Sequence, residues 1–145
     1  MSLNILVLDD RYASSDIVAY LEDFGYCVYW AKEYLSANYY IDVEPGILSF
    51  SGMIIDLDIP YNENDFTEKE HDVLRKYPVN VSGWLWIKNV LKMHDYLGDI
   101  IILSGHHRSI IDDELKDYEG RITYISKSDS MALKHIERVL KKETF

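Results

Sequence analysis

Five short apolar runs, separated mostly by segments of helical length, limit what this chain can fold into. Each run has the length of a β-strand, and three are apolar at consecutive positions and rich in Ile, Val and Leu, which is typical of strands covered on both faces. The runs are NILVLDD (4–10), YCVYWA (26–31), GMIIDLD (52–58), DIIILSG (99–105) and RITYISK (121–127). This alternation predicts an α/β domain with a mostly parallel sheet.

Three further segments have apolar residues at helical spacing. The first ends near Gly25, the second runs from Gly83 to Gly98, and the third starts at residues 128–129 and ends in lysines, which the helix dipole favours there. Their predicted inward-facing residues are Ile17, Val18, Leu21 and Phe24, then Leu85, Val90, Leu91 and Met93, then Met131, Leu133, Ile136, Val139 and Leu140.

A polar, charged stretch interrupts this pattern at about 61–82. It is much longer than an ordinary strand-to-helix loop of roughly two to six residues. We therefore expect an insertion there, between the third strand and the third helix of the sheet. Thr67 and Glu70 match a capping box, which predicts a short helix inside the insertion. The predicted inward-facing residues of that helix are Val73, Leu74 and Tyr77.

Length and charge narrow the classes of function. A chain of 145 residues suits one domain, which we expect to span 1–145. The chain has 15 Lys and Arg against 25 Asp and Glu, a net charge of −10, which argues against direct nucleic-acid binding and favours cationic ligands such as a metal ion.

The one cysteine, Cys27, has no internal disulfide partner and is expected to be buried. No run suits a membrane span and no signal-peptide pattern opens the chain, so we expect a cytoplasmic protein.

Reactive side chains follow the predicted strands where each one ends. Asp9 and Asp10 end the first run, and Asp56 and Asp58 end the third. Because the carboxyl ends of parallel strands meet at one edge of the sheet, these acids should lie together and repel one another unless a cation is bound. Oxygen ligands suit Mg²⁺. Ser104 and Lys127 end the fourth and fifth runs, and with a carboxylate–magnesium pair they would form a cradle for a phosphoryl group.

The motifs LVLDD, IIDLDIP, ILSG and YISK, in this order on the first, third, fourth and fifth strands, resemble the receiver domain of two-component response regulators. The resemblance implies a flavodoxin-like (CheY-like) parallel sheet of order 2-1-3-4-5 with helices on both faces. It implies that Asp56 is the phosphoacceptor, that Asp10 binds Mg²⁺ directly and Asp9 through water, and that Asp58 gives its backbone carbonyl to the metal.

The resemblance extends to the remaining site residues. Ser104 matches the hydroxyl residue that bonds the phosphoryl oxygen, Lys127 the lysine of the site, and Tyr124 the aromatic switch residue. His106, two residues after the hydroxyl, and Asp58 match positions that tune phosphoryl lifetime. The implied partners are a histidine kinase or phosphotransfer protein and a downstream protein target, with no enzymatic activity beyond autophosphorylation and autodephosphorylation. The implied output face is built from the fourth helix, fifth strand and fifth helix, near His107, Arg108 and Ile111.

The sequence departs from the receiver pattern in two places. Lys127 is followed by Ser128, where the family usually has a proline in a cis bond, so we expect a trans bond or a shifted loop. The glycine that normally follows Pro60 within a few residues appears only as Gly83, after the insertion. These departures favour a pseudo-receiver, a binding module that works without phosphorylation, as one alternative.

Other interpretations of the same residues remain open. IIDLD followed by a serine and a lysine also matches a haloacid-dehalogenase-like phosphatase, although that family has its nucleophile on the first strand. Read alone, Asp9 and Asp10 are equally consistent with helix caps, and the Asp58 side chain with a solvated loop acid. His106 and His107 are adjacent, so their side chains diverge and a shared metal ion is not expected.

Overall fold

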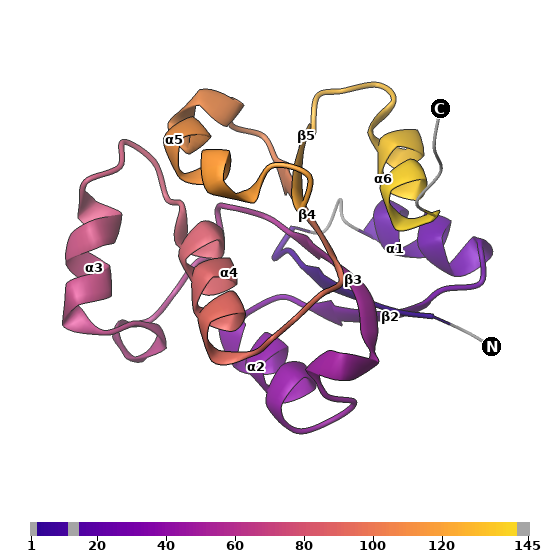
Figure 1. The fold of residues 1–145 in the computed structure, drawn as a ribbon, viewed down its shortest axis with the longest axis horizontal. Helices are drawn as coiled ribbons and strands as arrows, with labels where there is room; N and C mark the ends of the chain where they lie inside the picture. The colour runs from indigo at the N-terminus through magenta and orange to yellow at the C-terminus, as the bar shows by residue number, and fades with distance from the viewer. Residues whose placement is uncertain (1–2, 12–14, 142–145) are drawn as a thin grey trace.

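A parallel sheet of five strands forms the centre of the molecule (Figure 1). The computed structural model describes residues 3–11 and 15–141. All strand pairs are parallel and the order is β2-β1-β3-β4-β5, so the predicted α/β class and the 2-1-3-4-5 order are confirmed. The strands are β1 (Asn4–Leu8), β2 (Cys27–Ala31), β3 (Phe50–Ile55), β4 (Asp99–Ser104) and β5 (Ile122–Ser126).

Helices cover both faces of this sheet. α1 (Ser15–Asp23) and α6 (Ala132–Lys141) lie on one face, and α2 (Tyr34–Asp42), α4 (Ser82–Met93) and α5 (Asp112–Leu115) lie on the other (Figure 1). α3 (Glu68–Arg75) stands beside α4, outside this layer. The short 3-10 turns are η2 (Ile47–Ser49), η3 (Glu63–Asp65), η4 (Arg108–Ile110) and η5 (Lys116–Tyr118). Within the described ranges, every helix is too short or too polar to cross a membrane.

Alternate side chains of each strand pack on opposite faces of the sheet. In β4, Ile101 and Leu103 join the core beneath α1 and α6, whereas Ile100 and Ile102 join the core beneath α2, α4 and α5. All four are at most 2% exposed. β4 therefore has no side that faces solvent, which explains why its sequence is apolar at consecutive positions.

The segment between β3 and α4 has its own local structure. Thr67 and Glu70 form the predicted capping box at the start of α3: the Thr67 hydroxyl accepts a hydrogen bond from the Glu70 amide at 3.2 Å, and the Glu70 carboxylate accepts one from the Thr67 amide at 2.8 Å. Leu74 is buried against the main core. The sequence did not predict the second capping box, which Asn62 and Asp65 form around η3.

Several details differ from the predictions. α4 ends at Met93 rather than Gly98, because His94 already has an extended backbone. α2 was not predicted, since Tyr34 and Ile41 are buried while Leu35 is exposed, and this leaves no clear apolar stripe in the sequence. Five residues expected to be buried are exposed: Phe24, Cys27, Val73, Met93 and Met131. All but Val73 lie at the end of an element or on an edge strand, where packing partners are missing on one side.

Candidate functional site

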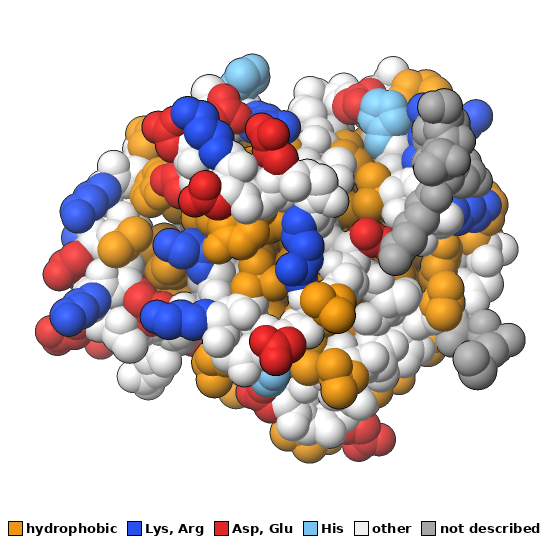
Figure 2. Space-filling view, in the orientation of Figure 1, with side chains coloured by type: hydrophobic (Ala, Val, Ile, Leu, Met, Phe, Trp, Pro, Cys, Tyr) orange, Lys and Arg blue, Asp and Glu red, His pale blue; other side chains and the backbone are white. Residues whose placement is uncertain are grey.

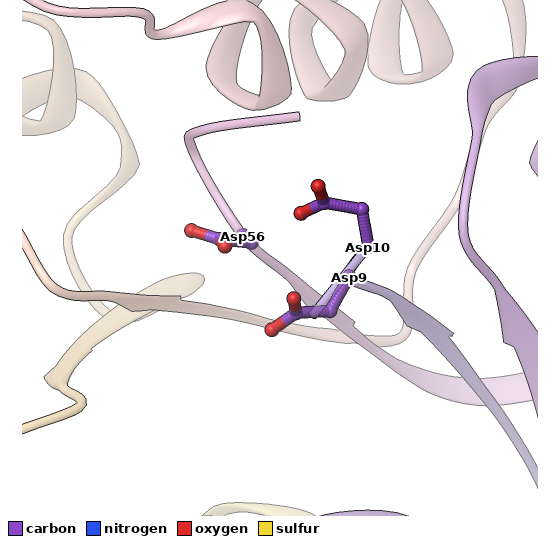
Figure 3. Close-up of side chains that lie close together, drawn as sticks. All are labelled: Asp9, Asp10 and Asp56. Carbon is purple, nitrogen blue, oxygen red and sulfur yellow. The ribbon is translucent and has the colours of Figure 1, made fainter. Parts of the chain in front are cut away.

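Three carboxyl groups meet at the carboxyl ends of β1 and β3 (Figure 3). Asp9 and Asp10 follow β1, and Asp56 follows β3. The two strands are neighbours in the sheet, with Leu8 aligned to Ile55, so the residues that follow them are brought side by side. One oxygen from each of the three carboxyl groups lies within 4.8 Å of the others.

Burial makes this cluster costly for the protein. The Asp9 and Asp56 residues are only 3% and 2% exposed. Asp10 is partly buried, and its Oδ1 atom has no hydrogen-bond partner in the described part of the chain although it is shielded from solvent. A shielded carboxylate oxygen beside two other carboxylates is a site of strongly negative potential.

Lys127 neutralises part of this charge. Its Nζ atom lies 2.9 Å from Asp9 Oδ2 and 2.9 Å from Asp56 Oδ2. The lysine is held in place because its backbone amide donates a 2.8 Å hydrogen bond to the Ser104 carbonyl. Among the described residues the only cis peptide bond is Glu44–Pro45, so the bond between Lys127 and Ser128 is trans. The lysine therefore reaches both acids without the cis bond of the usual family pattern.

The ionisation of the site follows from this arrangement. Burial raises the pKa of the Asp56 carboxyl above its ordinary value, and the nearby Asp9 carboxylate adds to this, while Lys127 opposes it. Burial alone would lower the pKa of Lys127, but its hydrogen bonds to Asp9 and Asp56 outweigh burial and raise it. The lysine therefore stays protonated.

This donor set fits a divalent cation. Three carboxylates and one ammonium leave a charge of about −2 when all are ionised, and carboxylate oxygens are the ligands that Mg²⁺ and Ca²⁺ prefer. The Asp10 Oδ1 atom, which has no hydrogen-bond partner in the part of the chain that the structure describes, is available as a ligand.

Ser104, Tyr124 and His106 lie together beside the acid cluster. Ser104 is fully buried at the end of β4, and its hydroxyl accepts a 3.0 Å hydrogen bond from the His106 amide. The Tyr124 hydroxyl donates to the His106 carbonyl. Burial raises the pKa of Tyr124, and a hydrogen bond with the Ser104 side chain partly offsets this. The backbone at His106 thus connects the serine to the tyrosine.

Asp58 is surrounded by groups that sequence reasoning did not connect to it. Its carboxylate lies 3.6 Å from Arg11 Nη2 and 4.0 Å from His106 Nε2, and it accepts a 3.1 Å hydrogen bond from the Asn80 amide. Arg11 directly follows the Asp9–Asp10 pair, which was an available signal. Asn80 gave none, because it comes from the far end of the inserted segment and its contact depends on how that segment folds back.

The start of α4 closes one side of the site. A Cβ atom on Gly83 would lie 1.9 Å from the Asp56 carbonyl oxygen, so only glycine allows the helix to approach this closely. The Gly83 amide donates a 3.0 Å hydrogen bond to the Leu57 carbonyl, which fixes the loop after Asp56.

Comparison with known proteins identifies the fold. No family model matches the sequence, and no curated protein matches it. Among solved structures, the chain is similar to a response regulator from Burkholderia pseudomallei with a phosphorylated aspartic acid, calcium ion and citrate (22% identity, TM-score 0.64). The match covers 94% of this chain and 65% of that one.

Two more similar structures are receiver proteins that the chain matches over most of their length. One is a CheY-like receiver domain from Methanospirillum hungatei, with 18% identity, a TM-score of 0.65, and coverage of 98% of this chain and 96% of that chain. The other is a receiver protein from Sinorhizobium medicae, with 15% identity, a TM-score of 0.67, and coverage of 97% and 93%. These matches show that the chain has the receiver-domain fold.

Proposed function

We propose that this chain, which has the fold of response regulator receiver domains, accepts a phosphoryl group on Asp56 with the help of Mg²⁺. The observation that supports this most is the position of Asp56: a carboxylate 2% exposed, with Lys127 at 2.9 Å and two further acids beside it. The proposal extends to residues 1–145 as a single receiver with an insertion at about 61–82, of which 61–81 lie between β3 and α4.

The residues of the site would divide the work of phosphoryl transfer. Asp10, Asp56, Asp9 through water, and the Asp58 backbone carbonyl would hold Mg²⁺, which when bound neutralises charge on the transferred phosphoryl oxygens. An Asp56 oxygen forms the new bond to phosphorus as the bond to the donor's histidine nitrogen breaks, and the leaving imidazole takes up a proton. The Lys127 ammonium then faces an oxygen of the phosphoryl group.

Ser104 and Tyr124 would report the change to a protein-binding surface. The Ser104 hydroxyl oxygen accepts a hydrogen bond from the His106 amide. An acyl phosphate on Asp56 would offer a charged acceptor to the Ser104 O–H group. If Ser104 turns toward that acceptor, its hydrogen bond with the His106 amide changes. The Tyr124 hydroxyl, which donates to the His106 carbonyl, is then affected as well. The surface so affected is the implied output face near His107 and Arg108. Its fourth and fifth helices are α5 and α6 here, because α3 belongs to the insertion, and its strand is β5. A histidine kinase or phosphotransfer protein would supply the phosphoryl group, and a downstream protein would bind this surface.

Tryptophan fluorescence tests the proposal directly, because the Trp30 indole donates a 2.9 Å hydrogen bond to the Asp9 carbonyl. We expect Mg²⁺, and then beryllofluoride as a stand-in for the phosphoryl group, to change the emission. Asp56→Asn should abolish the fluoride response, and Trp30→Phe should remove most of the signal while leaving binding intact by calorimetry. Uptake of label from a small phosphodonor by the Asp56→Asn variant would contradict the proposal.

The same measurements separate the alternatives. A chain that binds its partner equally well before and after the Asp56→Asn substitution, and shows no response to Mg²⁺ by calorimetry, would be a pseudo-receiver. Repeated turnover of a phosphomonoester would instead support a haloacid-dehalogenase-like phosphatase.

A further inference from the structure

A cavity of about 730 Å³ lies at the opposite end of the sheet from Asp56. It is bounded by α4, by the segment that joins α4 to β4, and by the turn that precedes β5. Because β4 and β5 begin there and end at Ser104 and Ser126, the cavity is at the amino edge of the sheet and the acids are at the carboxyl edge. Its volume suits a small organic molecule.

Cations gather around this cavity although the protein as a whole is acidic. Lys88, Lys92 and Arg121 line it, against the single carboxylate of Asp95, in a chain with a net charge of −10. His94, which also lines it, lies 3.4 Å from Asp42. Figure 2 shows this face, with lysine and arginine side chains around apolar surface over α4 and the segment that follows it.

Arg121 lacks the partners that a shielded guanidinium normally has. Its Nε and Nη2 atoms are buried and without a hydrogen-bond partner, and across residues 3–11 and 15–141 no ion pair involves Arg121, Lys88 or Lys92. Asp99 lies beside Arg121 in the sheet, because Ile100 pairs with Ile122, but Nε and Nη2 still lack an acceptor. Shielded donors without an acceptor are unfavourable, and an anion in the adjoining cavity would compensate part of this cost. A guanidinium recognises carboxylates and phosphates in particular, because its planar donors match their oxygens.

Part of the cavity wall is apolar. Leu85, Tyr96 and Tyr118 contribute to the lining. Tyr96 is 3% exposed and donates a hydrogen bond to the Phe50 carbonyl at 3.1 Å, and Tyr118 packs edge-on against Trp84 with ring centroids 5.5 Å apart. These contacts fix the two tyrosine rings, so an apolar ligand body would bind a surface that is already formed.

We propose that this cavity is a second ligand site, which binds a small organic anion: a carboxylate or phosphate group against Arg121, Lys88 and Lys92, attached to an apolar or aromatic body that packs on the tyrosines. The site is separate from the phosphoacceptor and does not depend on it.

Titration of the Asp56→Asn protein without Mg²⁺ tests this proposal under conditions in which the proposed phosphoacceptor site is not active. Benzoate and phenyl phosphate serve as probes, with benzyl alcohol as the uncharged match, and amide NMR shifts locate the binding. We expect shifts at Lys92, Leu97, Tyr118 and Arg121 with at least one of the anions and none with the alcohol. The anion that binds with the higher affinity identifies whether the site prefers a carboxylate or a phosphate group. Weaker binding of inorganic phosphate than of phenyl phosphate would show that the apolar body contributes to affinity.

Two substitutions and one control make the result specific. Arg121→Gln and Lys92→Gln should each weaken binding, the former by about tenfold or more because it removes a charged hydrogen-bond donor. Lys92 is exposed, so its replacement leaves folding unchanged. Lys69→Gln, an exposed lysine on α3 away from the cavity, is the matched control and should have no effect. The proposal is wrong if neither anion shifts the cavity residues, or if affinity is the same in Lys69→Gln and both cavity variants.

Discussion

Asp10 occupies an unfavourable position in the protein without metal. Its Oδ1 atom is buried without a hydrogen-bond partner among the described residues, and Lys127 contacts the other two acids instead. The structural strain of the site is therefore electrostatic, and it can be relieved by removing one negative charge.

We expect Asp10→Asn to increase the free energy of unfolding by about 1 kcal/mol in the absence of divalent metal, because it removes repulsion among three close carboxylates. The same change should weaken Mg²⁺ binding. Urea denaturation in EDTA measures the first effect. Asp23→Asn, at an exposed position, should change stability little, and a loss of stability in Asp10→Asn would contradict this account.

At the scale of elements, the approach of α4 to the loop after β3 depends on one missing side chain. Gly83→Ala would place a Cβ atom 1.9 Å from the Asp56 carbonyl oxygen, so the helix or the loop must move. We expect a loss of at least about 2 kcal/mol in stability and impaired phosphorylation. Gly105→Ala is the matched control, since a Cβ there meets no atom within 4 Å and should cost little by thermal denaturation.

The inserted segment is attached to the body of the fold by α3. Glu70 closes the capping box and also accepts a 2.6 Å hydrogen bond from the Asn89 amide of α4. Desolvation would raise the pKa of Glu70, but its hydrogen bonds with Thr67 and Asn89 outweigh this and lower it below the usual 4.5.

A lowered folded-state pKa means that Glu70 stabilises the fold fully above pH 4.5 and loses this contribution as the pH falls through its folded value. We expect Glu70→Gln to be less stable than the wild type near pH 7 by up to about 1 kcal/mol, and the difference to shrink at acidic pH. Chemical denaturation at pH 7, 5 and 3 checks this. A difference that stays constant with pH would show that the charge of Glu70 does not contribute.

At the scale of the whole molecule, metal binding should appear as added stability. A ligand that binds only the folded state stabilises it by about 2.7 kcal/mol at one hundred times its dissociation constant. We expect Mg²⁺ to raise the unfolding midpoint in urea relative to EDTA, and Asp56→Asn to lose most of this gain. An equal gain in Asp56→Asn would place the metal elsewhere.

The sequence predicted those parts of the molecule that follow from strand order. Once the strands are parallel, Asp9, Asp10 and Asp56 must meet at one edge, and the structure places their oxygens within 4.8 Å. What the sequence did not predict depends on packing between distant segments. Asn80 reaches Asp58 only because 61–81 folds back over the loop after β3. No local sequence pattern predicts the cationic cavity, since Lys88 and Arg121 come from distant segments of the chain.

β4 runs from one edge of the sheet to the other, since it begins beside the cationic cavity and ends at Ser104. Its six residues span about 17 Å, so a ligand in the cavity and a phosphoryl group on Asp56 can be bound at once without touching. Any energetic coupling between them must then be reciprocal: the factor by which the anion changes affinity for beryllofluoride equals the factor by which beryllofluoride changes affinity for the anion. A thermodynamic cycle of four titrations would measure that factor from either direction.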